Sequence, residues 1–224
     1  MTIAHWPRLE RPREKLLSSG AAMLSDAELL AVFLQTGTRG KTALDLAREL
    51  ILQFGGLSRL LAANQQELCA HVGVGMAKAA GFAAMKELFQ RQMLEELKCR
   101  DVLSSSAATR DYLRTRFRHC QSEIFSCLFL NNQHHVLSLE EMFSGTIDGA
   151  AVYPREVVRR CLYHNAAAVI FAHNHPSGVA EPSQADIAIT KKLKSALQTI
   201  EVRVLDHLVI GDSTVVSLAE RDLL

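Results

Sequence analysis

The sequence predicts an α+β protein in which a small helical domain precedes an α/β domain with a mixed sheet. Across residues 1–100 the apolar residues fall into segments of helix length, and no run of β-branched residues interrupts them. After residue 101, short apolar runs of strand length alternate with amphipathic stretches of helix length. The 224 residues suffice for two modest domains, so we place the boundary between residues 100 and 101.

The helices of the first domain are indicated by their start and stop residues. Ser25 and Glu28 have the spacing of a capping box ahead of an apolar run, and Asn64 and Glu67 repeat that spacing. Glycines follow two of the segments and are typical helix stops. The expected helical segments are residues 29–34, residues 42–53, a stretch from residue 64 and a stretch that ends near residue 98.

The second domain is expected to alternate strands with helices around a mixed sheet. Strands are predicted over four apolar runs, residues 123–130, 135–143, 166–172 and 202–210. Helices are predicted over residues 154–164, where Pro154 suits the first helical position, and over residues 183–198. Residues 103–106 (LSSS) predict a linker or a helix cap.

Composition excludes several classes of protein. No apolar run reaches the about 18 residues of a membrane span. The start, MTIAHWPRLERPREK, has charges and prolines where a signal peptide needs about 7–15 apolar residues, so we expect a cytoplasmic protein. The five cysteines lack C-x-x-C spacing, which argues against a disulfide framework or a thiolate zinc cage. A formal net charge of +1 gives no overall attraction to nucleic acid.

Two histidines at the end of a predicted strand form the most informative feature. His173 and His175 are two residues apart, so their side chains project from the same face of the strand. A loop rich in proline and glycine follows, and the next helix begins at Ser183, with Asp186 in its first turn. Two neutral imidazoles and one carboxylate make a three-ligand zinc site with its fourth position open to water, which is the catalytic arrangement.

Each part of this segment also has a purely structural interpretation. A His-x-His pair can be the polar end of a strand. Ser183 and Asp186 fit an N-cap followed by a favourable carboxylate in the first turn of a helix. Packing alone explains the combination poorly, but the residues by themselves leave both interpretations open.

The same residues resemble a known motif. His-x-His, seven residues, a serine, two residues and an aspartate is the spacing of the JAMM (MPN+) metalloprotease motif. HNHPSG followed by PSQAD is similar to the bacterial RadC (UPF0758) family, and within it to the YicR-like branch. The resemblance extends over nearly the whole chain through PREKLL, ELLAVFLQTGTRGK, GVGMAKAA, FSGTI, PREVVR and VLDHLVIG.

This resemblance implies an MPN (JAMM) domain of cytidine deaminase-like fold over residues 101–224, with one zinc ion held by His173, His175 and Asp186. It places Ser183 where the family has a serine that hydrogen-bonds the developing oxyanion. It places Glu123, the first residue of a predicted strand, where the family has its general base. Glu123 also fits simple solvation of a strand end. The competing carboxylates are Glu140, Glu141 and Glu156.

Two other segments have open interpretations. Asp206-His207 fits a pair that orients a ligand histidine, or a polar end of a strand. The segment GVGMAK, residues 73–78, resembles the hairpin of helix-hairpin-helix modules, in which backbone N–H groups at a helix N-terminus bind a phosphate without reading sequence. It also fits a plain glycine-rich turn between two packed helices.

We therefore expect a JAMM-type zinc metalloprotease that hydrolyses main-chain or isopeptide bonds of a polypeptide substrate, with no membrane partner. The alternative is a DNA-binding accessory protein of repair or recombination, with a structural or repurposed metal site. It would contact DNA non-specifically through the helix-hairpin-helix-like domain over residues 1–100, with Lys78 among the contacting residues. A zinc nucleobase deaminase is excluded because the H-x-E…P-C-x-x-C pattern is missing from the sequence.

Overall fold

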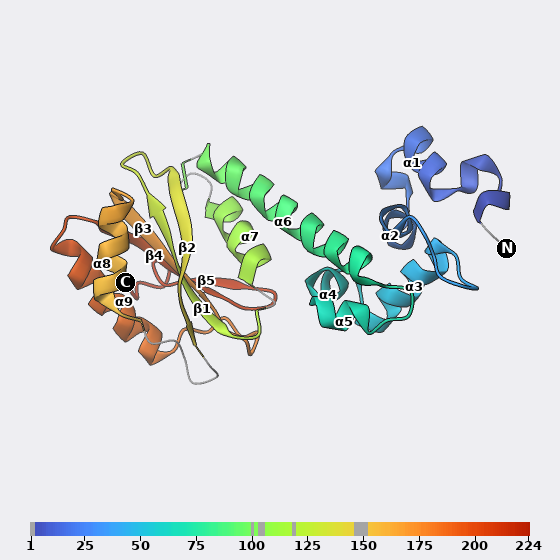
Figure 1. The fold of residues 1–224 in the computed structure, drawn as a ribbon. Coiled ribbons are helices and arrows are strands. Elements are labelled where there is room, and N and C mark those ends of the chain that lie inside the picture. Colours follow the sequence, from blue (N-terminus) through green and yellow to red (C-terminus); the bar gives the residue numbers. More distant parts are fainter. Residues whose placement is uncertain (1–2, 100, 103–105, 118–119, 146–151) are drawn as a thin grey trace. The chain divides into compact units, whose positions relative to one another are not determined.

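The computed structural model describes residues 3–99, 101–102, 106–117, 120–145 and 152–224 (Figure 1). The chain divides into two compact units, Met1–Leu88 and Phe89–Leu224. The division falls within a long helix, α6 (Met76–Lys98), whose residues contribute to the core of each unit. The predicted linker at residues 103–106 lies, except for its last residue, outside the described residues.

The first unit is helical, as predicted. Besides the first part of α6 it contains α1 (Pro12–Ser19), α2 (Asp26–Leu34), α3 (Ala43–Phe54), α4 (Leu57–Ala62), α5 (Gln65–Cys69) and the short 3₁₀ helices η1 (Ile3–His5), η2 (Arg8–Glu10) and η3 (Ala21–Met23). Ser25 and Asn64 form the predicted capping boxes, and Thr42 forms a third. The helices α1 and α4 lack a side-chain cap and were not predicted, although α1 begins at Pro12, a residue type that suits the first helical position.

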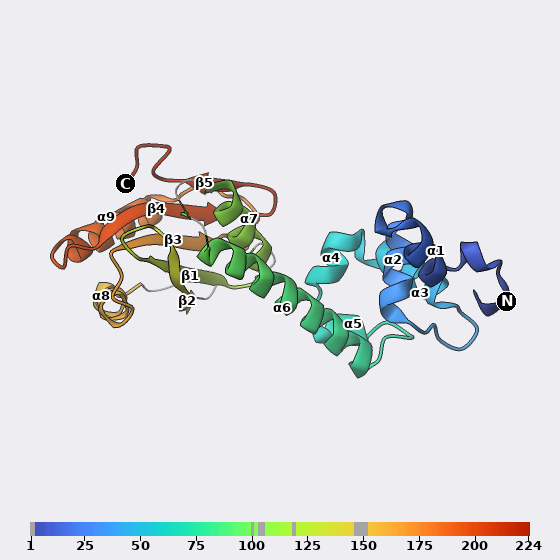
Figure 2. The ribbon, with the colours of Figure 1, turned by 90° about the horizontal axis from the view of Figure 1, so that it is seen from above.

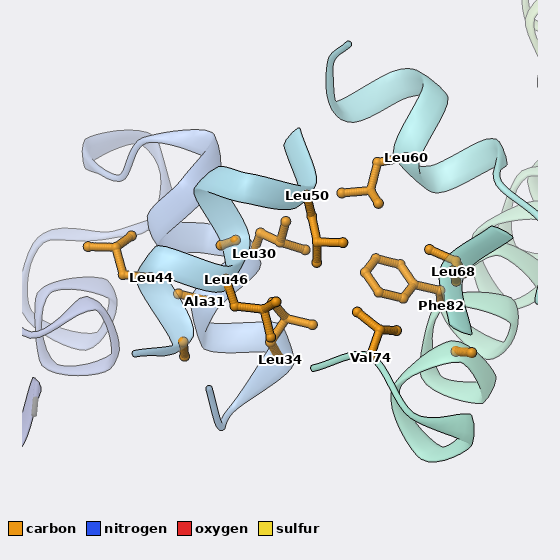
Figure 3. Close-up of a cluster of buried hydrophobic side chains, with 13 residues drawn as sticks. Leu30, Ala31, Leu34, Leu44, Leu46, Leu50, Leu60, Leu68, Val74 and Phe82 are labelled. Atoms are coloured by element: carbon orange, nitrogen blue, oxygen red, sulfur yellow. The ribbon is translucent and has the colours of Figure 1, made fainter. Parts of the chain in front are cut away.

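One apolar cluster holds the first unit together (Figure 3). Leu46 and Leu50 of α3 are fully buried, as is Leu60 of α4. Phe82 of α6 packs edge-on against Phe33 of α2, with 5.0 Å between the ring centroids. The first turns of α6 are therefore part of this core.

The second unit contains a five-stranded sheet with the spatial order β2-β1-β3-β4-β5. The strands are β1 (Glu123–Leu130), β2 (Val136–Gly145), β3 (Ala168–Asn174), β4 (Arg203–Ile210) and β5 (Val215–Ser217). Strands β3 and β4 are parallel and are connected through α9 (Gln184–Gln198), whereas the other neighbours are antiparallel, so the predicted mixed sheet is confirmed. Strand β5 has three residues, too few for a periodic pattern to predict.

Helices cover both faces of this sheet (Figures 1 and 2). The end of α6 and α7 (Ser106–Phe117) pack on one face, with Leu128 of β1. The helices α8 (Pro154–Tyr163) and α9 pack on the other face, with Phe129 of β1 and Phe171 of β3. Every residue of β3 is buried, which explains why its sequence is a continuous apolar run. Within the described residues, no helix is long and apolar enough to cross a membrane.

Candidate metal centre

The two motif histidines lie where β3 ends on the face covered by α8 and α9. His173 is almost completely buried, is paired with Phe125 of β1, and its ring is nearly parallel to the phenyl ring at a centroid distance of 6.5 Å. His175 lies just beyond the strand, where its backbone N–H donates to the carbonyl of Ile210 in β4. Because strand side chains alternate between faces, both imidazoles reach the same space.

A tight loop then brings a carboxylate back to the histidines. Gly178 has a φ of +81°, and a Cβ atom at this position would lie 2.7 Å from the carboxylate of Asp212, so the loop requires glycine here. The chain enters α9 with Ser183 as its N-cap and Asp186 in the first turn, as predicted.

The three predicted ligands come together in the structure. The Nε2 atoms of His173 and His175 are 2.9 Å apart, and the Asp186 carboxylate oxygens lie 3.3 Å from the first and 3.5 Å from the second. Ligand atoms at about 2.0–2.2 Å from a shared zinc ion lie at most about 4.4 Å from one another. All three distances fall within this limit, so one ion can contact all three side chains.

The electrostatics of this cluster favour a positive charge. Nδ1 of His175 lies 2.8 Å from the carbonyl oxygen of Val179, and a carbonyl only accepts hydrogen bonds, so this nitrogen carries the proton and Nε2 faces the cluster. The hydrogen bond with Asp186 raises the pKa of His175 despite its partial burial. Burial opposes ionisation of Asp186, but the neighbouring rings of His173 and His175 hold the pKa of this carboxyl well below its usual value. The donor set therefore fits a cation bound by two nitrogens and one oxygen.

Ser183 and Asp186 also form a complete capping box. The Ser183 hydroxyl and backbone N–H both donate to Oδ2 of Asp186 at 2.7 Å, and the Asp186 N–H returns a hydrogen bond to the Ser183 hydroxyl at 3.1 Å. Oδ1 of the same carboxylate points to His173. The structural interpretation and the metal-site interpretation of this helix start are therefore compatible, because Oδ1 of Asp186 faces His173 while Oδ2 accepts the capping bonds.

The structure places Glu123 on the same side of the sheet as the cluster. It is the first residue of β1, two residues before Phe125, which pairs with His173. Alternation along β1 therefore puts Glu123 on the face of Phe125 and of the histidines. Its carboxylate is close enough to contribute to the raised pKa of His175, after the larger effects of Asp186 and of the Val179 carbonyl.

The competing carboxylates lie in ion pairs with arginines. They are Glu140 with Arg160, Glu141 with Arg116 and Glu156 with Arg159. Glu140 also contacts Nε2 of His164 at 2.7 Å, so all three side chains have partners other than His173 and His175. Of the four predicted candidates for the base, Glu123 is the one whose charge acts on His175.

Asp206 and His207 have different partners in the structure. Asp206 accepts hydrogen bonds from the hydroxyl of Ser217 and the N–H of Ala219, so it anchors the C-terminal segment. His207 is fully buried, and its Nε2 lies 2.8 Å from Nδ1 of His173. Burial lowers the pKa of His207 well below 6.5, so the ring is neutral at neutral pH. His207 is therefore the member of the predicted orienting pair that contacts His173.

Asn174, between the two histidines, is a residue that the sequence analysis does not single out. Its side chain is buried; Oδ1 accepts the N–H of Ile124 at 2.8 Å, and Nδ2 donates to the carbonyls of Ser122 at 3.0 Å and Cys120 at 3.3 Å. It therefore fixes the start of β1, including Glu123, beside the end of β3. An asparagine at the end of an otherwise apolar strand is the signal that could have identified it.

Comparison with known proteins gives the family. Residues 103–223 match a model described as a RadC-like JAB domain, and residues 3–80 match one described as UPF0758 N-terminal. A UPF0758 protein of Cellvibrio japonicus is 59% identical over 221 residues, 99% of each chain. The chain belongs to the UPF0758 family.

Other UPF0758 relatives match over the full length. The protein of Thioalkalivibrio sulfidiphilus is 58% identical over 224 residues, and that of a Marinomonas species is 55% identical over 223 residues, in both cases 100% of each chain. The predicted family and the JAB/MPN domain in the C-terminal half are thus confirmed. The relatives are named for the family alone and indicate no substrate.

In the first unit, Lys78 has a structural role. Its ammonium group donates to the carbonyls of Thr36 at 2.7 Å, Gly73 at 2.8 Å and Gly37 at 3.3 Å. These bonds tie the GVGMAK turn to the loop before α3 and use the three donors of the ammonium group. Lys78 would have to give them up to contact a phosphate. DNA binding through the backbone of this turn remains a prediction.

Proposed function

We propose that this protein is a zinc-dependent hydrolase that cleaves peptide or isopeptide bonds in a polypeptide substrate. The observation that carries the proposal is the convergence of two imidazole nitrogens and one carboxylate, 2.9–3.5 Å apart, at the end of β3. Membership of a family with a RadC-like JAB domain supports it. Glu123 shares a face of β1 with Phe125, which pairs with His173, and Ser183 is the N-cap of the helix that carries Asp186, so these two residues are our candidates for the base and the oxyanion donor.

His173, His175 and Asp186 would hold the ion. A nitrogen-rich set of three protein ligands suits zinc and leaves one position for water. When bound, zinc lowers the pKa of a coordinated water to about 7 and polarises a carbonyl oxygen. The low pKa of Asp186 keeps this ligand ionised at neutral pH, and the protonated Nδ1 of His175 leaves its Nε2 free to bind.

Glu123 would act as the general base and then as the general acid. Its carboxylate takes one proton from the attacking water, whose oxygen forms a bond to the carbonyl carbon. The same carboxyl then gives this proton to the leaving nitrogen as the C–N bond breaks. Each turnover thus adds one water across the bond and returns Glu123 to its ionised form.

Ser183 would stabilise negative charge on the carbonyl oxygen. Its hydroxyl donates to Asp186 in this structure, and a turn about the C–O bond redirects that proton to a substrate oxygen. The two backbone bonds of the capping box do not need the hydroxyl proton. The helix start therefore remains capped while Ser183 acts on the substrate.

A Glu123→Gln variant tests this function. The zinc-loaded wild-type protein and the variant are incubated with a mixture of unfolded polypeptides, and new chain termini are identified by mass spectrometry. We expect both proteins to bind zinc and only the wild type to generate new termini, since glutamine cannot accept the proton. Equal cleavage by both proteins, or none by a zinc-loaded wild type on any polypeptide or isopeptide-linked substrate, would contradict the proposal.

A further inference from the structure

His173 and Asp186 are connected by a buried chain of hydrogen bonds, in addition to their direct contact. Nδ1 of His173 lies 2.8 Å from Nε2 of His207, and Nδ1 of His207 lies 2.6 Å from the hydroxyl of Thr190. The Thr190 hydroxyl donates to the backbone carbonyl of Asp186 at 2.5 Å. Thr190 and His207 have no exposed surface, so solvent does not reach this chain of hydrogen bonds at these two residues.

The backbone carbonyl of Asp186 determines the direction of every hydrogen bond in this chain. A backbone carbonyl only accepts, so the single hydroxyl proton of Thr190 points to Asp186. The hydroxyl oxygen must then accept a proton from Nδ1 of His207. A neutral imidazole carries one N–H, so Nε2 of His207 is an acceptor and takes the Nδ1 proton of His173.

This assignment leaves Nε2 of His173 without a proton. That atom lies 2.9 Å from Nε2 of His175 and 3.3 Å from the Asp186 carboxylate, at the centre of the proposed metal site. The rings of Phe125 and Phe171 surround His207, with centroid distances of 5.5 Å and 5.8 Å. Both rings are apolar. The two nitrogens of His207 are therefore satisfied by the hydrogen bonds to His173 and Thr190.

We propose that Thr190 and His207 are positioning residues that hold His173 as its Nδ1–H tautomer and so keep Nε2 ready to bind the metal. The inference rests on the proposed metal centre. Without the Thr190 hydroxyl, His207 can place its proton on Nε2 and donate it to His173. His173 then carries its own proton on Nε2, which must leave before the nitrogen can bind an ion. Loss of the direct partner of a ligand histidine costs about 10- to 100-fold in metal affinity. Thr190 acts on His173 through that partner, His207, so this range is the upper limit for its loss.

Two substitutions of Thr190 separate the hydroxyl from the shape of the side chain. Thr190→Val keeps the branched shape and removes the hydroxyl, whereas Thr190→Ser keeps the hydroxyl and loses a methyl group. Zinc affinity is measured by competition with a chelator at neutral pH, on full-length protein whose fold is checked by thermal unfolding. We expect about 10-fold weaker binding in Thr190→Val, the lower end of the range for a direct partner, and near wild-type binding in Thr190→Ser.

The second measurement needs no metal. In the metal-free protein, long-range ¹H–¹⁵N NMR spectra of the imidazole rings report which nitrogen of His173 carries the proton. We expect Nδ1–H in the wild type and in Thr190→Ser, and a mixture or Nε2–H in Thr190→Val. Such a change of tautomer would not follow from a loss of packing alone.

Unchanged affinity in Thr190→Val, or a His173 tautomer that is the same in all three proteins, would overturn the inference. Absence of zinc binding by the wild type would instead overturn the proposed function. In that case the NMR comparison still decides whether Thr190 and His207 set the tautomer of His173.

Discussion

The side chain of Asn174 accepts the backbone N–H of Ile124 at 2.8 Å, so a side chain continues the pairing of β3 with β1 beyond the last backbone pair. Asn174 faces the α7 side of the sheet, and its two neighbours His173 and His175 face the proposed metal site. The same segment thus supplies two of the proposed ligands and fixes the strand that carries Glu123. This relationship explains how the proposed base on one strand is held beside proposed ligands from another.

Replacing Asn174 with alanine should weaken both the fold and the placement of Glu123. The N–H of Ile124 and the two carbonyls that Asn174 binds lose a partner that is itself buried. We expect unfolding free energy to fall by about 1–3 kcal/mol and cleavage to fall more than zinc affinity. Asn131→Ala is the control, because the Asn131 side chain likewise bonds the backbone, accepting the N–H groups of Gln133 and His135, but in the turn at the other end of β1. Equal loss of cleavage in folded samples of both variants would contradict this role.

Zinc affinity should fall in acid through protonation of His175. Its hydrogen bond with Asp186 raises its pKa above 6.5, against the effect of burial, so a proton occupies the site below that raised pKa and is absent above it. Zinc must displace this proton. We expect a plateau of affinity at higher pH and a fall of about tenfold per pH unit below the raised pKa. Titrations with a chelator at several pH values test this, and a flat profile from about pH 8 to pH 6 would contradict it.

Glu28 should stabilise the first unit in a pH-dependent way. Hydrogen bonds from the Ser25 backbone and from Lys15 lower its pKa from 4.5 to about 2. A depressed pKa in the folded state means that the stabilisation is present above pH 4.5 and is lost as the pH falls towards 2. Because this side chain is partly exposed, we expect Glu28→Gln to cost about 1 kcal/mol at neutral pH.

Urea unfolding at neutral and acidic pH measures the effect of Glu28. The difference between the wild type and Glu28→Gln should shrink as the pH drops below 4.5. Glu14→Gln is the matched control, since Glu14 lies in a surface ion pair with Arg11 and should contribute less than about 0.5 kcal/mol. A Glu28 effect that is constant with pH would show that the carboxylate charge is not its source.

Two buried serines should respond in opposite directions to alanine. Among the described residues, the hydroxyl of Ser126 in β1 is buried without a hydrogen-bond partner, so Ser126→Ala should be neutral or stabilise by about 1 kcal/mol. Ser217 donates to Asp206 and accepts from the N–H of Glu220, so Ser217→Ala should destabilise by about 1–3 kcal/mol. Thermal unfolding of both variants measures this. Destabilisation by Ser126→Ala would reveal a partner for its hydroxyl.

Local signals made much of the fold predictable. The capping boxes at Ser25 and Asn64 and the continuous apolar run of β3 depend on neighbours in sequence, and the structure confirms them. Helix α7 was not predicted, although a helix cap was one of the two interpretations of residues 103–106 and α7 begins at Ser106. Strand β5 is held by pairing with β4 instead of by its own pattern.

The candidate site was predictable only in part, because some of its contacts depend on the tertiary fold. His173, His175 and Asp186 share a motif of fixed spacing, and the structure brings them together. The contact between His207 and Thr190 requires β4 and α9 to pack on one another, which no local pattern indicates. Asp206 and His207 are neighbours in sequence, but they serve different parts of the unit, since strand alternation directs adjacent side chains to opposite faces.

Metal content of the purified full-length protein tests the central claim most directly. The wild type is compared with the His173→Ala/His175→Ala double variant by elemental analysis after incubation with zinc at neutral pH and removal of free metal. We expect about one zinc ion per chain in the wild type and none in the folded double variant. A wild type without zinc, or equal zinc in both proteins, would contradict it.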